Sequence, residues 1–181
     1  MAYSEKYRII NVLGNQAVRK FGTVYLIEEI ETGQKKIMKQ LVLNAQNQHI
    51  SQRLEREAGF NFQSKGLPQV TEFIMTESEI MLIKEFVDGI PLDDYWQTIP
   101  RKQHLDHLMK ILKALSPLFQ RLKEEQIVHC DIKPSNILIE KKDDSIICHL
   151  IDFGMAIRQE EDKDFKLLFP LGYAAPELIL N

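Results

Sequence analysis

The hydrophobic pattern of this 181-residue chain changes once along its length, and this change limits the folds that it can adopt. Up to residue 87, the apolar residues come in short runs rich in β-branched and aromatic side chains, which are typical of strands. From residue 103 to residue 125 they recur every three or four positions, which predicts one long amphipathic helix. We therefore expect a strand-rich first lobe and a helical second lobe.

The first half is interpreted as an antiparallel sheet with one helix. Its predicted elements are strands at 7–14, 21–30 and 34–43, a helix at 47–63 and a hairpin at 70–87 with its turn at 76–79. Residues 88–96 contain Gly and Pro and are interpreted as a connection. In the second half, Pro117 lies inside the long helical pattern and is expected to bend or interrupt it. Apolar runs at 136–140 and 146–153 predict a second, small hairpin.

Charge and cysteine content exclude several classes of protein. The formal net charge is −3, with 23 basic and 26 acidic residues, so no broad basic surface is expected for nucleic acid or an anionic membrane. No apolar run reaches the length that a membrane-spanning helix needs. Cys130 and Cys148 are too few and too far apart for a disulfide framework, which favours a reducing compartment and a cytoplasmic location.

A dense polar cluster lies between two apolar runs in the second half. It has the pattern H-x-D-x-K-x-x-N, with Asp131, Lys133 and Asn136 as its charged and amide members. Asp152 follows 16 residues after Asn136, and Lys39 ends a strand-like run far upstream. A carboxylate to orient a hydroxyl, oxygen ligands for Mg²⁺ and lysines for phosphate are the groups that phosphoryl transfer needs.

These motifs resemble those of the eukaryotic-type serine/threonine protein kinase family. The stretch HCDIKPSN (129–136) matches the family's catalytic loop, DFG (152–154) its metal-binding motif, and AAPE (174–177) the end of its activation segment. The resemblance runs from about residue 7 to the last residue of the chain. It implies an α+β, protein-kinase-like fold of two lobes. The first is an antiparallel β-sheet N-lobe at residues 1–87, and the second is a shortened, mainly helical C-lobe at residues 88–181.

The resemblance also implies a role for each motif residue. Asp131 would be the catalytic base and Lys133 would neutralise the transferred group, while Asn136 and Asp152 would hold Mg²⁺. The positions that the resemblance assigns to ATP binding are Gly14, Gly22, Val24, Ile37, Lys39, Glu57, Glu85, Val87 and Leu138.

Three of these ATP-binding positions have a more specific expected role. Glu57 would pair with Lys39, with Glu55 as the second choice for that partner. The backbone at residues 85–87 would form the hinge that faces adenine.

Two departures from the family concern regulation. Cys130 stands where the family usually has an arginine that pairs with a phosphate on the activation loop, and cysteine cannot form that ion pair. The segment 155–174 contains no serine or threonine, and its only hydroxyl belongs to Tyr173. We therefore hypothesise that activity does not depend on phosphorylation of this segment.

Further departures concern the nucleotide site and the C-lobe. The phosphate loop keeps Gly14 and Gly22 but lacks the family's middle glycine. Lys84 lies just before the hinge, where it must either extend its ammonium to solvent or pair with an acid. The chain stops four residues after Glu177, before the helices that continue the family's C-lobe. We therefore expect an incompletely covered apolar surface on the long helix, and self-association through it.

The preferred function is phosphorylation of a serine or threonine hydroxyl on a protein substrate, with ATP and Mg²⁺. One alternative is a nucleotide-binding pseudokinase that acts as a regulatory or interaction module. The irregular phosphate loop, Lys84 and the missing part of the C-lobe favour it, as does Ile37, which stands where the family usually has an alanine against adenine. Another is a small-molecule kinase, because the region that docks peptides in the family is absent. ATP binding without turnover would indicate the first alternative, and turnover on a small alcohol but on no protein would indicate the second.

Overall fold

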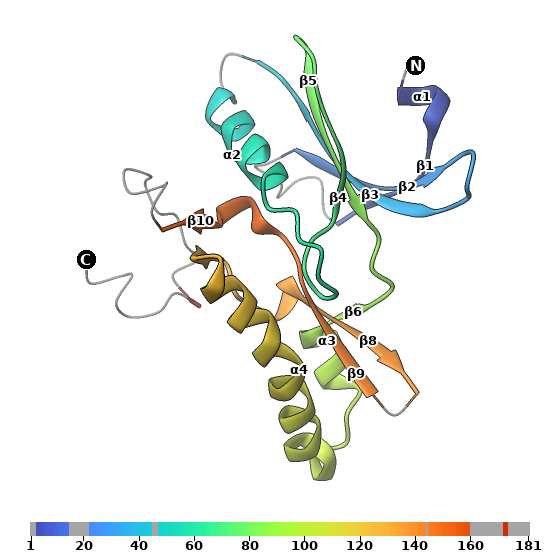
Figure 1. Ribbon diagram of the computed structural model, residues 1–181. Helices are drawn as coiled ribbons and strands as arrows, with labels where there is room; N and C mark the ends of the chain where they lie inside the picture. Colours follow the sequence, from blue (N-terminus) through green and yellow to red (C-terminus); the bar gives the residue numbers. More distant parts are fainter. Residues whose placement is uncertain (1–2, 15–21, 45–46, 144, 160–171, 174–181) are drawn as a thin grey trace. The chain divides into compact units, whose positions relative to one another are not determined.

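The computed structural model describes residues 3–14, 22–44, 47–143, 145–159 and 172–173 (Figure 1). The chain divides into two compact units, which are described separately. The first unit comprises Met1–Gln63 and Pro68–Phe86, and the second comprises Ser64–Leu67 and Val87–Asn181. No helix in the described part of the chain is long and apolar enough to cross a membrane.

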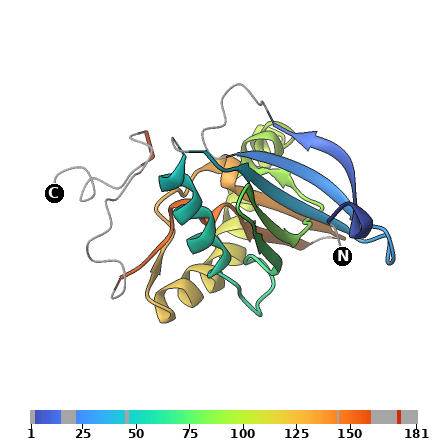
Figure 2. The same ribbon diagram turned by 90° about the horizontal axis from the view of Figure 1, so that it is seen from above.

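The first unit is built on one antiparallel sheet of five strands, and the predicted strands are present. Its elements are α1 (Tyr3–Lys6), β1 (Tyr7–Leu13), β2 (Thr23–Glu29), β3 (Lys35–Val42), α2 (Gln48–Ala58), β4 (Val70–Met75) and β5 (Glu79–Glu85). The strand order is β1-β2-β3-β5-β4, so that β3 and β5 lie at the centre. Figure 2 shows this sheet from above, from the blue β1 to the green β4 and β5.

Each face of this sheet carries its own apolar cluster, because side chains alternate between faces along a strand. On one face α2 packs through Leu54 against Leu41, Ile80 and Leu82. The cluster on the other face consists of Tyr7, Ile27, Met38, Met81 and Ile83. The face that α2 covers also carries Lys39, since Lys39 and Leu82 are register partners on β3 and β5.

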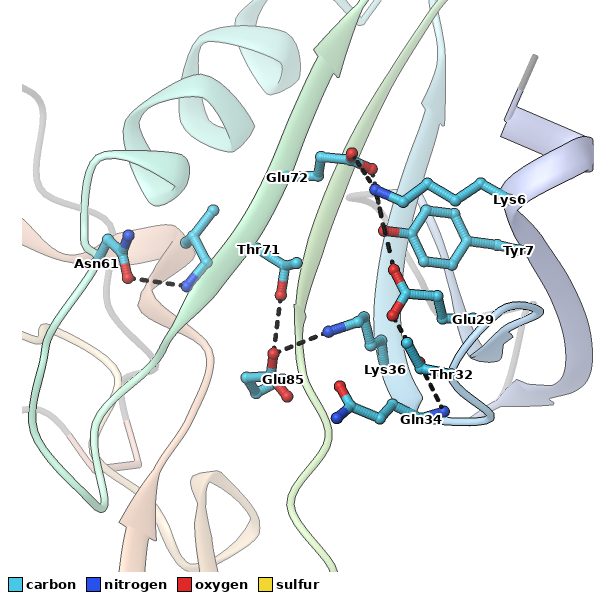
Figure 3. A network of polar contacts seen from close by, with 11 residues as sticks. Lys6, Tyr7, Glu29, Thr32, Gln34, Lys36, Asn61, Thr71, Glu72 and Glu85 are labelled. Atoms are coloured by element: carbon cyan, nitrogen blue, oxygen red, sulfur yellow. Dashed lines mark hydrogen bonds and ion pairs between the residues drawn. The ribbon is translucent and has the colours of Figure 1, made fainter. Parts of the chain in front are cut away.

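Polar contacts join the two edge strands of the sheet to each other (Figure 3). Lys6 donates a 2.5 Å hydrogen bond to Glu72 of β4, and the Tyr7 hydroxyl donates a 3.1 Å bond to the same carboxylate. Since β1 and β4 are opposite edges, these contacts require the strongly twisted sheet that L-amino acids favour.

The helix predicted at 47–63 is shorter than expected and ends at Ala58. Gly59 follows it, and the chain leaves the helical path while burying both Phe60 and Phe62. Burial at alternate positions fits extended chain better than helix, and the Phe62 N–H donates to the Pro68 carbonyl at 2.9 Å. The prediction for residues 59–63 was therefore wrong.

The second unit combines short strands with one long helix. Its elements are β6 (Ile90–Pro91), α3 (Leu92–Gln97), α4 (His104–Glu124), β7 (Ile127–Val128), β8 (Ile137–Lys142), β9 (Ser145–Leu150) and β10 (Ile157–Arg158), with 3₁₀ turns at Arg101–Gln103, Pro134–Asn136 and Phe153–Met155. β6, β8 and β9 form a three-stranded sheet, and β7 pairs with β10. The second hairpin is thus present, whereas the predicted connection at 88–96 contains β6 and most of α3.

The long helix α4 packs on β9 with one side and exposes apolar residues on another. Its buried residues are Ile111, Leu115, Leu118 and Leu122. Its exposed large apolar residues are Leu105, Leu108, Met109, Leu112 and Phe119. The helix continues through Pro117 without interruption, although proline cannot donate the hydrogen bond that the Lys113 carbonyl would otherwise receive.

Residues 64–67 belong structurally to the second unit, although they precede β4 in the chain. The Gly66 carbonyl accepts a 2.8 Å hydrogen bond from the N–H of Leu150 in β9. A side chain at Gly66 would place its Cβ 2.7 Å from the Cys148 carbonyl oxygen, and φ there is +89°. Glycine is therefore required for this close approach to β9.

Candidate active site

Two polar side chains of the catalytic-loop motif, Lys133 and Asn136, converge on the carboxylate of Asp131 in the second unit. Lys133 Nζ lies 2.8 Å and 3.1 Å from the two oxygens of Asp131. Asn136 Nδ2 donates to Asp131 Oδ2 at 2.7 Å and to the Asp131 carbonyl at 2.9 Å. Asp131 is buried with a 7% exposed fraction, so these donors compensate a carboxylate that is largely removed from water.

His129 links this loop to the segment that carries Asp152. Its Nε2 lies 3.1 Å from the Ile151 carbonyl, and its Nδ1 accepts a 3.3 Å bond from the Asp131 N–H. A carbonyl can only accept and a backbone N–H can only donate, so this pattern defines a neutral ring with its proton on Nε2. Burial lowers the pKa of His129, which agrees with the neutral form. The ring also packs against Phe153, with 4.5 Å between ring centroids.

Asn136 and Asp152 are held next to each other by the backbone. The N–H of Ile151 donates to the Asn136 carbonyl at 3.0 Å, and Asp152 is the next residue. Because Asn136 Nδ2 is used on Asp131, the side-chain Oδ1 is the atom of Asn136 that suits a cation. One carboxylate and one amide oxygen fit Mg²⁺, which usually takes one or two protein ligands and completes its shell with water and phosphate oxygens.

Within the described residues, no group of three or more His, Cys, Asp and Glu side chains could hold a metal ion. Asp152 has φ of +64° and Cys130 has φ of +60°, in the left-handed region that costs non-glycine residues about 1 kcal/mol or more. The strain at these positions shows that the surrounding contacts hold the loop firmly.

Cys130 lies between His129 and Asp131 and is half-buried. Its Sγ faces the Val128 carbonyl at 3.5 Å. Burial, and secondarily the charge of Asp131, raise the pKa of this thiol to about 11. Cys130 is therefore a neutral thiol at physiological pH and carries no charge of either sign.

In the first unit, Lys39 is paired with Glu57, and Glu57 has a second lysine partner. Lys39 Nζ lies 2.7 Å and 2.8 Å from the two carboxylate oxygens of Glu57. Lys84 Nζ lies 2.5 Å from Glu57 Oε1. Glu57 is buried with a 3% exposed fraction, whereas Glu55 is exposed and belongs to another side of α2. Lys84 thus pairs with an acid, and the sequence had not indicated which one.

Two of the apolar residues assigned to ATP, Val24 and Ile37, share the face of the sheet that carries Lys39. Val24 is the register partner of Lys39 on β2, and Ile37 lies two residues before Lys39 on β3. A side chain at Gly22 would place its Cβ 2.4 Å from the Gln40 carbonyl oxygen. The close approach to the Gln40 backbone therefore requires glycine at position 22, independently of any contact with phosphate.

Glu85, the first hinge residue, uses its polar groups within the first unit (Figure 3). Its N–H donates to the Gln69 carbonyl at 3.0 Å. Its side chain accepts bonds from Lys36 at 2.9 Å and from Thr71 at 3.2 Å, on the face opposite to Lys39. Only the Glu85 carbonyl is then suited to meet adenine.

The remaining assigned positions lie in separate places. Val87 begins the main part of the second unit, and Leu138 is a partly buried residue of β8 in the same unit. Gly14 is exposed after β1 with φ of +72°. Residues 15–21 of the phosphate loop, 160–171 of the activation segment and the AAPE motif at 174–177 lie outside the described residues. The structure thus brings two sets of predicted residues together by side-chain contacts, namely Asp131 with Lys133 and Asn136, and Lys39 with Glu57.

Comparison with known proteins identifies the family. The family model described as protein kinase domain matches residues 7–181, which is nearly the whole chain. The chain belongs to the protein kinase family, and its fold is that of a kinase domain.

Three relatives show how the chain compares with whole proteins. A probable serine/threonine-protein kinase pXi of Dictyostelium discoideum is 29% identical over 179 residues, covering 96% of this chain and 25% of that protein. A titin homolog of Caenorhabditis elegans is 30% identical over 96% of this chain and 1% of that protein. Myosin light chain kinase family member 4 of Homo sapiens is 29% identical over 88% of this chain and 41% of that protein. The chain therefore spans less than half the length of each of these relatives.

Proposed function

We propose that this chain transfers the γ-phosphoryl group of ATP to a serine or threonine hydroxyl of a protein substrate. The observation that supports this most directly is the cluster around Asp131, whose buried carboxylate is oriented by Lys133 and Asn136. Two of the relatives described above are named as kinases, which supports the same class of reaction. We further propose that residues 1–87 act as the N-lobe and residues 88–181 as a partial C-lobe.

Asp131 and Lys133 would carry out the chemistry at the substrate hydroxyl. Asp131 would accept a hydrogen bond from the hydroxyl and take its proton as the oxygen attacks the γ-phosphorus. The bond from the β,γ-bridging oxygen to that phosphorus breaks, and ADP leaves. Lys133, which is 29% exposed at its side chain, would turn from Asp131 toward the phosphoryl oxygens as their charge shifts.

The other residues would bind and orient ATP. Lys39 would contact the α- and β-phosphates while Glu57 keeps its ammonium in place. Val24, Ile37 and Leu138 would contact the adenine, and the backbone at Glu85 and Val87 would bind its edge. Asn136 and Asp152 would hold Mg²⁺, which when bound neutralises phosphate charge and orients the transferring group. Gly14 and Gly22 would allow the backbone to approach the phosphates.

The experiment that tests this proposal separates it from both alternatives. The chain is incubated with ATP labelled at the γ-phosphate, with Mg²⁺ or with EDTA, and offered a generic basic protein or a small alcohol. Binding of a fluorescent ATP analogue is measured in parallel. Mg²⁺-dependent label on serine or threonine of the protein is the expected result. Binding without label would indicate a pseudokinase, and label on the small alcohol alone would indicate a small-molecule kinase.

We also propose that this activity needs no phosphate on the activation segment. Cys130 is a neutral thiol and cannot pair with a phosphate, and the segment 155–174 has no serine or threonine. Activity should therefore be unchanged after phosphatase treatment, and a required phosphate found by mass spectrometry would contradict this. A cytoplasmic location is proposed because both cysteines are free thiols.

A further inference from the structure

Lys84 is a buried charged residue that the proposed reaction does not use. Only 10% of its side chain is exposed, and its ammonium lies 2.5 Å from Glu57 Oε1. It is the register partner of Ile37, so it lies on the same face of the sheet as Lys39. An ammonium at this depth is strongly unfavourable without a carboxylate, which explains why Lys84 reaches Glu57.

The Glu57 carboxylate is held from two neighbouring strands. Lys39 on β3 contacts both of its oxygens, and Lys84 on β5 contacts Oε1. The two lysines differ in what else they are proposed to do, because only Lys39 is assigned to the nucleotide phosphates. The contact of Lys84 with Oε1 therefore does not depend on the lysine that is assigned to phosphate.

The apolar contacts of α2 support the same arrangement. Leu54 of α2 packs on Ile80 and Leu82 of β5, the strand that carries Lys84. Glu57 lies one turn after Leu54 and meets Lys84 on that strand. Packing and ion pairing therefore fasten the same helix to the same strand, one turn apart.

We propose that Lys84 is a positioning residue for nucleotide binding, acting through Glu57 on Lys39. It keeps the Glu57 carboxylate directed at Lys39 in the nucleotide-free protein and during turnover. This inference rests on the proposed role of Lys39 in binding ATP. Lys84 would thus orient Glu57 and Lys39 through contacts within the first unit, without a phosphate on the activation segment.

The test compares four proteins with the wild type. Lys84→Met removes the charge and keeps a long apolar side chain, and Lys110→Met is the control because Lys110 forms an exposed pair with Asp106. Glu57→Gln and the double variant Glu57→Gln/Lys84→Met complete a double-mutant cycle, which measures the coupling between Glu57 and Lys84. For each protein we would measure the melting temperature, the Kd of a fluorescent ATP analogue with Mg²⁺, and kcat and KM for ATP, well below the melting temperature.

The expected results distinguish positioning from a purely structural role. Lys84→Met should weaken nucleotide binding and lower kcat/KM by about 10-fold, because a misplaced Lys39 loses its alignment with the phosphates. Lys110→Met should stay within about twofold of the wild type. Glu57→Gln should lower the melting temperature by about 10 °C, and adding Lys84→Met should restore part of it, because it removes the buried ammonium that has lost the Glu57 carboxylate.

Two results would overturn the inference. If Lys84→Met lowers the melting temperature but leaves Kd and kcat/KM within about twofold of the wild type, Lys84 is only structural. If the effects of Glu57→Gln and Lys84→Met on melting add without coupling, Lys84 does not hold Glu57. A wild type that binds no nucleotide would overturn the proposed function and the nucleotide role of Lys84, while the melting cycle would still decide the Lys84–Glu57 contact.

Discussion

Lys39 donates hydrogen bonds of 2.7 Å and 2.8 Å to the two carboxylate oxygens of Glu57. The pair joins β3 to α2, and Glu57 is buried while Lys39 keeps a 15% exposed side chain. The greater exposure of Lys39 suits a residue that must reach a ligand, and the burial of Glu57 suits a residue whose role is to orient Lys39.

Glu57→Gln should reduce phosphoryl transfer at least about 10-fold and lower the melting temperature, because two ammonium groups lose their carboxylate. Glu55→Gln is the matched control, since Glu55 is an exposed residue of the same helix. It should behave like the wild type in a γ-phosphate transfer assay and in thermal unfolding. The reverse pattern would make Glu55 the functional partner of Lys39.

The pH dependence of stability should contain a contribution from His129. Burial lowers the pKa of this histidine in the folded protein below its ordinary value of 6.5, against the opposing charges of Asp152 and Asp131. The unfolded chain therefore binds the proton more readily, and the contribution of His129 is fully present above pH 6.5 and is lost as the pH falls. Protonation would also remove the Nδ1 acceptor of the Asp131 N–H.

The measurement for His129 is the urea midpoint between pH 4.5 and 8 for the wild type, His129→Phe and His104→Phe. His129→Phe should be less stable at high pH but should lose less stability on acidification. His104 lies on another element, is only partly buried and bonds the Ile99 carbonyl, so its variant serves as the control for loss of an imidazole. Equal slopes in all three proteins would show that His129 does not contribute.

Cys130 should react slowly with alkylating reagents in the native protein. Its pKa of about 11, raised mainly by burial, leaves little thiolate at pH 7.5. Cys148 has a pKa of about 11 for the same reason and is the internal control. Mass spectrometry after iodoacetamide treatment should show little modification of either thiol without denaturant and complete modification in urea. Rapid, selective labelling of Cys130 would contradict the neutral thiol described here.

Self-association through the exposed apolar side of α4 remains a prediction. Leu105 is 72% exposed and Leu112 is 52% exposed, one heptad apart. If this side is an interface between copies, Leu105→Glu/Leu112→Glu should shift a concentration-dependent sedimentation coefficient to that of a monomer, with melting little changed. A wild type that sediments as a monomer at all concentrations would contradict the prediction.

The sequence predicted secondary structure where the hydrophobic pattern repeats over many residues, and it did not predict the short elements. The recurrence of apolar residues at every third or fourth position predicted a helix at 103–125, and the observed helix α4 spans His104–Glu124. α3 has six residues, too few to show a helical period, yet it buries Tyr95 completely. The end of α2 at Ala58 depends on where Phe60 and Phe62 find tertiary contacts, which local pattern does not specify.

The same distinction applies to the site. Motif spacing was enough to nominate Asp131, Lys133 and Asn136, and their hydrogen bonds are local in sequence. The partner of Lys84 is 27 residues away on another element, so only the packing of α2 on β5 could identify Glu57. The contact of His129 with Phe153 likewise joins segments that are distant along the chain. The chemical roles of all these residues stay predictions.

The most direct test of the central claim is the rate of γ-phosphate transfer by Asp131→Asn. Asparagine keeps the size of the side chain but cannot accept the hydroxyl proton, so transfer should fall by about 10²- to 10⁴-fold. Asp106→Asn, at an exposed position of α4, is the matched control and should keep the wild-type rate. Nucleotide affinity should remain near the wild type in both variants, and each rate is measured well below the melting temperature of the protein concerned. Transfer that persists in Asp131→Asn at the wild-type rate would contradict the assignment of Asp131 as the catalytic base.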